Sequence, residues 1–106
     1  MVYSTEQLKQ KMVPIAEKYQ LHSIYIFGSY ARGEATEDSD VDILIDRTNS
    51  KIRSLFDMGA LYLDLNETLK KEVDIVTVDS LDQPDVQRRT PGFKRHLFNE
   101  RVMMYG

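Results

Sequence analysis

The sequence contains no cysteine and no tryptophan, and only three prolines and five glycines among its 106 residues. The absence of cysteine excludes disulfide bonds and thiolate metal sites. No apolar run approaches the roughly 18 residues of a membrane span. The polar N-terminal segment also lacks the apolar core of a signal peptide. These absences favour a cytoplasmic protein that makes no contact with a membrane.

An excess of positive charge is also missing. The net charge of -3 disfavours general binding to a phosphate backbone, so no direct nucleic-acid binding is expected. The charges are uneven, with acids gathered in residues 34–46 and bases in residues 88–101. The basic segment either lies on a separate face or meets a phosphate or an acidic partner. With 42% apolar and 29% charged residues, residues 1–106 are expected to form a single globular domain.

Hydrophobic periodicity predicts alternating helices and strands. We expect helices at residues 5–19, 29–32, 52–70 and 93–100. We expect strands at residues 22–27, 41–47 and 72–79, and a short edge strand at residues 101–105. Pro14 could bend or split the first helix, and a short helix starting near Ser80 should be broken near Pro84.

A Gly-Ser pair follows the first predicted strand and precedes the acidic loop. Gly28 allows the backbone to approach a phosphate closely. Ser29 offers a hydroxyl and begins a short helix whose free amides favour an anion. Such a pair alone is a common turn, but its position between a strand and two aspartates favours phosphate binding.

Asp40 and Asp42 lead into the second predicted strand. Residues two apart on a strand point to the same face, about 6.6 Å apart along the chain. Two carboxylates at that distance repel by roughly 2–3 kcal/mol at an effective dielectric near 20, and a divalent cation reverses the sign of that energy. An all-oxygen pair suits Mg²⁺ or Mn²⁺. The pair by itself leaves open that Asp40 ends a solvated loop and Asp42 lies on an exposed edge.

Two familiar ion and phosphate motifs fail at defined positions. An EF-hand starting at Asp38 would need glycine where Ile43 stands and glutamate where Asn49 stands. A P-loop starting at Gly28 would need lysine where Glu34 stands. Neither a calcium loop nor a P-loop is therefore predicted.

A third carboxylate, Asp74, begins the third predicted strand. If this strand lies beside the second, Asp74 faces the same site as Asp40 and Asp42. Two metal-binding carboxylates and a third that accepts a proton are what phosphoryl and nucleotidyl transfer need. The alternative is a capping or surface acid at the end of a strand.

Gly28-Ser29, ten further residues and then Asp40-Val41-Asp42 resemble the signature of polymerase-β-type nucleotidyltransferases. The longer segments 27–34 and 39–42 look like the minimal nucleotidyltransferases of prokaryotes. The resemblance implies an α/β (α+β) fold with a small mixed sheet and flanking helices. It also implies that Gly28 and Ser29 bind the triphosphate, that Asp40 and Asp42 hold Mg²⁺ or Mn²⁺, and that Asp74 is the third metal carboxylate and general base.

Many relatives of this kind act as antitoxins to a HEPN-domain toxin, and some transfer AMP from ATP to a toxin tyrosine. The resemblance therefore implies the same activity and partner here. The alternative is a binding module that neutralises its partner by contact alone. Transfer to a small molecule is disfavoured because no second domain would shape its pocket. The wide apolar stripe of residues 55–69 and the basic C-terminal segment are candidate partner surfaces, although core packing is the better explanation of the stripe.

Overall fold

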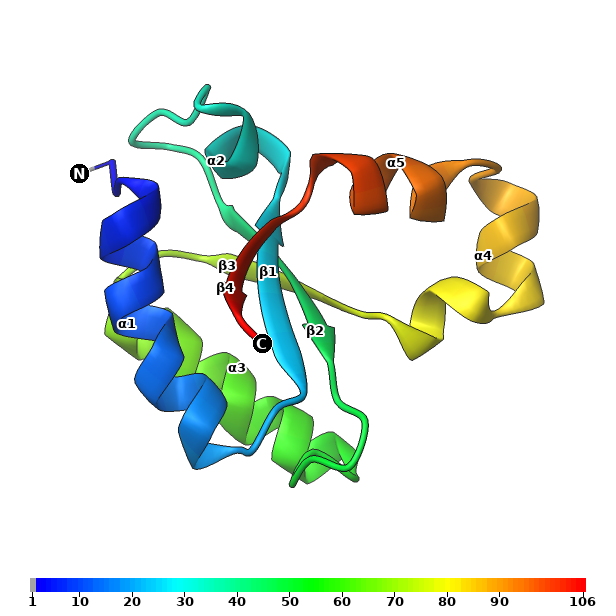
Figure 1. Ribbon diagram of the computed structural model, residues 1–106, viewed down its shortest axis with the longest axis horizontal. Coiled ribbons are helices and arrows are strands. Elements are labelled where there is room, and N and C mark those ends of the chain that lie inside the picture. The colour runs from blue at the N-terminus through cyan, green and yellow to red at the C-terminus, as the bar shows by residue number, and fades with distance from the viewer. Residues whose placement is uncertain (1) are drawn as a thin grey trace.

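The computed structural model describes residues 2–106, which form a four-stranded sheet flanked by helices (Figure 1). The elements in chain order are α1 (Thr5–Lys18), β1 (Ser23–Phe27), α2 (Gly28–Arg32), β2 (Val41–Asp46), α3 (Leu55–Leu69), β3 (Val73–Thr77), the 3₁₀ helix η1 (Asp79–Asp82), α4 (Pro84–Arg89), α5 (Phe93–Glu100) and β4 (Val102–Tyr105). Among residues 2–106, no helix has both the length and the apolar character needed to cross a membrane.

The sheet has the strand order β3-β2-β1-β4. β1 pairs antiparallel with β2 and with β4, whereas β2 and β3 are parallel. The predicted mixed sheet with flanking helices is therefore confirmed, and residues 102–105 form an edge strand as expected. Because β2 and β3 are in parallel register, Asp42 lies directly opposite Asp74.

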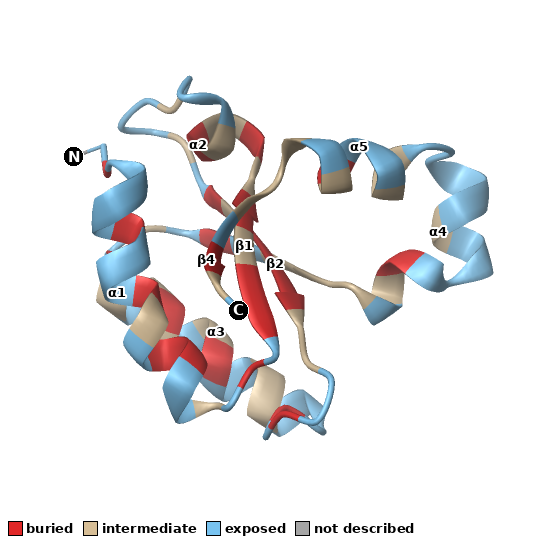
Figure 2. Cartoon of the chain, in the orientation of Figure 1, coloured by how far each residue is buried: buried red, intermediate tan, exposed pale blue. Residues whose placement is uncertain are grey.

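The main core lies between one face of the sheet and the helices α1 and α3 (Figure 2). Alternation along β2 sends Val41, Ile43 and Ile45 into this core. Leu44 points to the opposite face, where it packs with Leu81 of η1 and with a leucine of α5. Asp42 has the same strand parity as Leu44, so its carboxylate lies on the face away from α1 and α3.

The helix boundaries follow local signals. α1 runs through Pro14 without interruption, so the prediction of a split helix does not hold. α3 begins at Leu55 rather than residue 52, because Ser54 forms a capping box with Asp57. The predicted short helix near Ser80 is confirmed as η1, which ends before Pro84. Pro84 then starts a new helix, because it occupies the first turn of α4, where its missing N–H is not needed.

The apolar stripe of α3 is only partly a core feature. Leu61, Leu65 and Leu69 are fully buried, as core packing requires. Leu55 was expected on the same stripe, but its side chain is 90% exposed. The first turn of α3 extends past the edge of the main core, and a helical pattern in the sequence does not reveal where the covering surface ends.

A buried hydrogen bond ties the N-terminus to α3. The hydroxyl of Tyr3 donates to the carbonyl oxygen of Leu69 at 2.6 Å. We expect Tyr3→Phe to lower the free energy of unfolding by about 1–2 kcal/mol, because the buried carbonyl loses its donor. Urea denaturation followed by circular dichroism measures this loss. A variant as stable as the parent chain would show that water replaces the hydroxyl.

Candidate active site

Two carboxylates meet across the parallel strands β2 and β3. Asp42 is half-buried, and the exposed Asp74 is its partner in the register. Asp40, also exposed, stands immediately before β2. The prediction that Asp74 lies beside the second strand and faces the Asp42 site is therefore confirmed at the level of strand register.

The environment of Asp42 disfavours its negative charge. Burial raises the pKa of Asp42, and the charge of Asp74, a hydrogen bond to Asp74 and the charge of Asp40 raise it further, to about 6. The guanidinium of Arg32 lowers this pKa only in part. A proton or a cation bound at these carboxylates therefore stabilises the site.

The residues fit a hard divalent cation by their chemistry. Their donors are carboxylate oxygens, and the raised pKa of Asp42 reflects its burial first and then the negative charges of Asp74 and Asp40 beside it. Within the part of the chain that the structure describes, however, no three acidic or histidine side chains converge closely enough to form a ready metal site. Asp42 and Asp74 are the pair in contact, whereas Asp40 acts on Asp42 through its charge. That all three coordinate a metal stays a prediction.

The Gly28-Ser29 turn joins β1 to α2 and lies against Asp42. Gly28 has a φ of +69°, a conformation that residues with a Cβ rarely adopt. A Cβ at Gly28 would overlap the carboxylate of Asp42. Gly28 therefore makes room for the acid beside the turn, and the half-buried Ser29 follows it as the first hydroxyl of α2.

Glu100, which no sequence motif marks, contacts this turn from the end of α5. The Gly28 N–H donates to the Glu100 carboxylate at 2.6 Å, and Arg32 donates to the same oxygen at 3.1 Å. The Nε2 atom of His96 lies 3.2 Å from the other carboxylate oxygen of Glu100, Oε2. The amide of Gly28 is thus engaged within the chain, so the structure offers the hydroxyl of Ser29, rather than the Gly28 N–H, to a phosphate. The available sequence signal is that Glu100 is the single acidic residue in residues 93–106.

Glu100 should make stability depend on pH. Burial raises the pKa of Glu100, but the Gly28 N–H and Arg32 together outweigh burial and hold the pKa below its usual value. The stabilisation is therefore present above the unfolded-state pKa of 4.5 and is lost as pH falls through the lowered folded-state value. We expect Glu100→Gln to melt at a lower temperature than the parent chain at pH 7 and to converge with it in acid. Thermal melts across this range test the prediction, and an equal difference at every pH would contradict it.

The basic C-terminal segment is largely engaged within the chain. Arg88 pairs with Asp85, and Lys94 pairs with Asp82. The guanidinium of Arg101 stacks on two aromatic rings, 4.3 Å from the centroid of Tyr25 and 4.1 Å from that of Phe98. These contacts favour a structural role for much of the segment.

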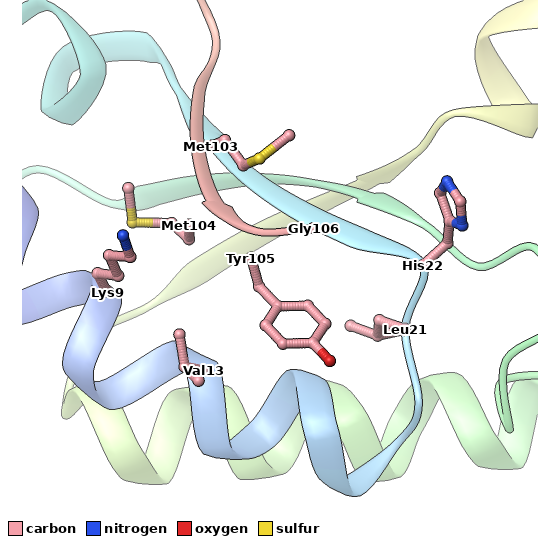
Figure 3. A pocket seen from close by; sticks show the side chains of 8 residues that line it. All are labelled: Lys9, Val13, Leu21, His22, Met103, Met104, Tyr105 and Gly106. Carbon is pink, nitrogen blue, oxygen red and sulfur yellow. The ribbon is translucent and has the colours of Figure 1, made fainter.

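A hollow of about 780 Å³ lies at the opposite end of β1 from Gly28 (Figure 3). Its lining residues are Lys9, Val13, Leu21, His22, Met103, Met104, Tyr105 and Gly106. This lining contains no aspartate or glutamate side chain, so this hollow is separate from the carboxylate site.

Known proteins resemble the chain along nearly its whole length. A protein of Methanocaldococcus jannaschii, named as a protein adenylyltransferase, is 40% identical over 96 residues, which cover 91% of this chain and 92% of that protein. A solved minimal nucleotidyltransferase has a TM-score of 0.71 at 29% identity, covering 94% of this chain and 95% of the other.

A third likeness is to a chain from the complex of a tri-AMPylated Shewanella oneidensis HEPN toxin with its MNT antitoxin. Its TM-score is 0.63 at 18% identity, covering 96% of this chain and 72% of the other, which shows a shared fold. The family described as polymerase β nucleotidyltransferase matches residues 10–103. The motif, the fold and these matches agree, and the chain belongs to the polymerase β nucleotidyltransferase family.

Proposed function

We propose that this chain transfers AMP from ATP to a tyrosine hydroxyl of a HEPN-type toxin and thereby acts as its antitoxin, with Mg²⁺ or Mn²⁺ as cofactor. The observation that carries the proposal is that Asp42 lies against Gly28 of the Gly28-Ser29 turn and opposite Asp74 on the neighbouring strand. The name of the M. jannaschii relative supports AMP transfer to a protein, and the Shewanella complex supports a toxin as the acceptor.

The reaction assigns a role to each site residue. The tyrosine oxygen attacks the α-phosphorus of ATP, the bond to the β-phosphate oxygen breaks, and pyrophosphate leaves. Asp74 is placed to take the proton of the attacking hydroxyl, because its exposed carboxylate can be reached by a protein substrate. Asp40 and Asp42 would hold the divalent cation, which when bound neutralises triphosphate charge. The hydroxyl of Ser29 would donate to a phosphate oxygen.

The test is intact-mass spectrometry of the chain and of the product of the neighbouring gene, the candidate toxin, after incubation with ATP and Mg²⁺. A toxin heavier by one or more AMP units supports the proposal, and EDTA should prevent the mass change because the carboxylates then lack their cation. A stable complex without any mass change would instead assign neutralisation to contact alone. If the chain neither binds nor modifies the toxin, the proposed function is wrong.

Replacing Ser29 by alanine should weaken the use of ATP more than it affects folding. We expect the KM for ATP to rise by about tenfold with a smaller change in kcat, because a ground-state phosphate contact is lost. Steady-state assays over a range of ATP concentrations measure this split. Ser39→Ala is a matched control, because Ser39 bonds within the acidic loop, to Thr36. An unchanged KM in Ser29→Ala would remove Ser29 from the phosphate site.

A further inference from the structure

The outer side of α3 carries an exposed apolar stripe. Phe56 and Leu63 are seven residues apart and so lie on nearly the same side of the helix, and they are 91% and 65% exposed. Gly59 and Ala60 lie between them and are also exposed. We call these four residues the α3 stripe. The neighbouring Leu55 widens its apolar surface at the start of the helix.

Gly59 is not explained by packing within the chain. A glycine in the middle of a helix costs about 1 kcal/mol relative to alanine. Apart from its chain neighbours and the backbone of α3 itself, an added Cβ at Gly59 would meet no heavy atom within 4 Å, so no other part of the chain requires the small residue. A second helix packed against this position would benefit, because small residues let two backbones approach closely.

We propose that the α3 stripe is the contact between two copies of this chain, whose α3 helices pack antiparallel about a two-fold axis. The stripe is self-complementary, because its midpoint falls between Gly59 and Ala60. A two-fold axis at that midpoint places Phe56 of each copy against Leu63 of the other. The two small residues then face their counterparts at the axis, where the helices are closest.

The charges beside the stripe favour a second copy in this orientation. Arg53 precedes α3 at one end of the stripe and Glu67 lies beyond its other end, and both are exposed. Antiparallel pairing brings Arg53 of each copy near Glu67 of the other, whereas parallel pairing would oppose like charges. The chain thus supplies both halves of the charge pattern, which a partner of unrelated sequence would have to match.

The expected dimer is weak. A single helix pair covers less than the roughly 800 Å² per partner of a standard interface, so we expect a dissociation constant in the micromolar range. The inference does not rest on the proposed function, although the two surfaces adjoin, because Gly59 also lines a hollow that contains Asp74.

Cysteine cross-linking tests the geometry, and the chain has no native cysteine to interfere. Ala60→Cys should form a disulfide-linked dimer in a glutathione redox buffer, because the two sulfurs meet near the axis. Glu67→Cys is the control, since its Cα atoms would be about 22 Å apart in the antiparallel pair, too far for a disulfide. Equal cross-linking of both variants would overturn the proposed orientation.

Sedimentation equilibrium of the whole chain tests the association itself. The parent chain should show a monomer–dimer equilibrium, and Phe56→Asp should weaken it by at least about tenfold, because a charge replaces the main apolar contact. Val2→Asp is the matched control, being an exposed apolar residue outside the stripe. A parent chain that stays monomeric up to about 1 mM would overturn the proposal. Undiminished dimerisation of Phe56→Asp would overturn it as well. So would a Phe56→Asp variant that still dimerises but no longer binds a separate partner, because the stripe would then be the contact for that partner.

Discussion

An Asp42→Asn variant is expected to lose nucleotidyl transfer by roughly 10²–10³-fold or more while folding at least as stably as the parent chain. The amide has nearly the same shape and can still hydrogen-bond to Asp74. The asparagine side chain lacks the negative charge that would hold a cation at the triphosphate. Loss of activity without loss of stability separates a functional carboxylate from a structural one.

The stability of Asp42→Asn should depend on pH in a defined direction. The folded pKa of Asp42, about 6, lies above its ordinary value of 3.8, so the folded state binds this proton more tightly than the unfolded state. Below pH 3.8 Asp42 is protonated in both the folded and the unfolded state, so the site does not lower the free energy of unfolding. As pH rises from 3.8 to about 6 the parent chain loses stability, and above 6 the whole penalty is present. Asparagine removes this penalty at neutral pH.

The expected gain at pH 7 is about 1 kcal/mol, because Asp42 is only half-buried and solvent screens part of the repulsion. Thermal melts at pH 4 and pH 7 measure the difference, alongside the transfer assay. The gain should appear at pH 7 and nearly vanish at pH 4.

Asp46→Asn is the matched control, since Asp46 stands on the same strand and face as Asp42. The hydroxyl of Thr48 donates to it at 2.6 Å, and this hydrogen bond holds the pKa of Asp46 below its usual value. Asp46→Asn should therefore lose stability at pH 7 and keep its activity. If Asp42→Asn retained transfer, or if both variants lost it, the cation role of Asp42 would be rejected.

Elements set by local signals could be predicted from the sequence. Ser4 caps α1 through a capping box with Gln7, and residues 93–100 form a helix within the predicted bounds. Gly33 ends α2 in the left-handed conformation that its sequence position indicates. These features depend on residues close together in the chain, so the sequence contains their whole cause.

Features set by long-range contacts could be predicted only in part. The Asp42–Asp74 pairing follows from strand parity if β2 and β3 are neighbours, as the structure shows them to be. The contact of Glu100 with Gly28 spans 72 residues and depends on how the arm of η1, α4 and α5 returns over the sheet (Figure 1). The exposure of Leu55 likewise depends on where the main core ends. Neither has a local cause that a sequence pattern could express.

A Gly28→Ala variant is expected to lose both activity and stability, through two distinct causes. The methyl group would overlap the Asp42 carboxylate, and the φ of +69° is unfavourable for alanine. We expect the strain to cost about 1 kcal/mol or more and the displacement of Asp42 to reduce transfer by about 10²-fold, because catalytic groups must hold their geometry closely.

Gly33→Ala separates these two causes. Gly33 has a nearly identical φ of +72°, but an added Cβ there would meet no atom within 4 Å. It should therefore show the strain of about 1 kcal/mol and keep most of its transfer activity. Urea denaturation and the mass assay compare the two variants directly. If both lose stability but only Gly28→Ala loses transfer, the space beside Asp42 is what the reaction requires of Gly28. If both retain transfer, the turn tolerates a shift of Asp42, and the close approach of turn and carboxylate has no catalytic role.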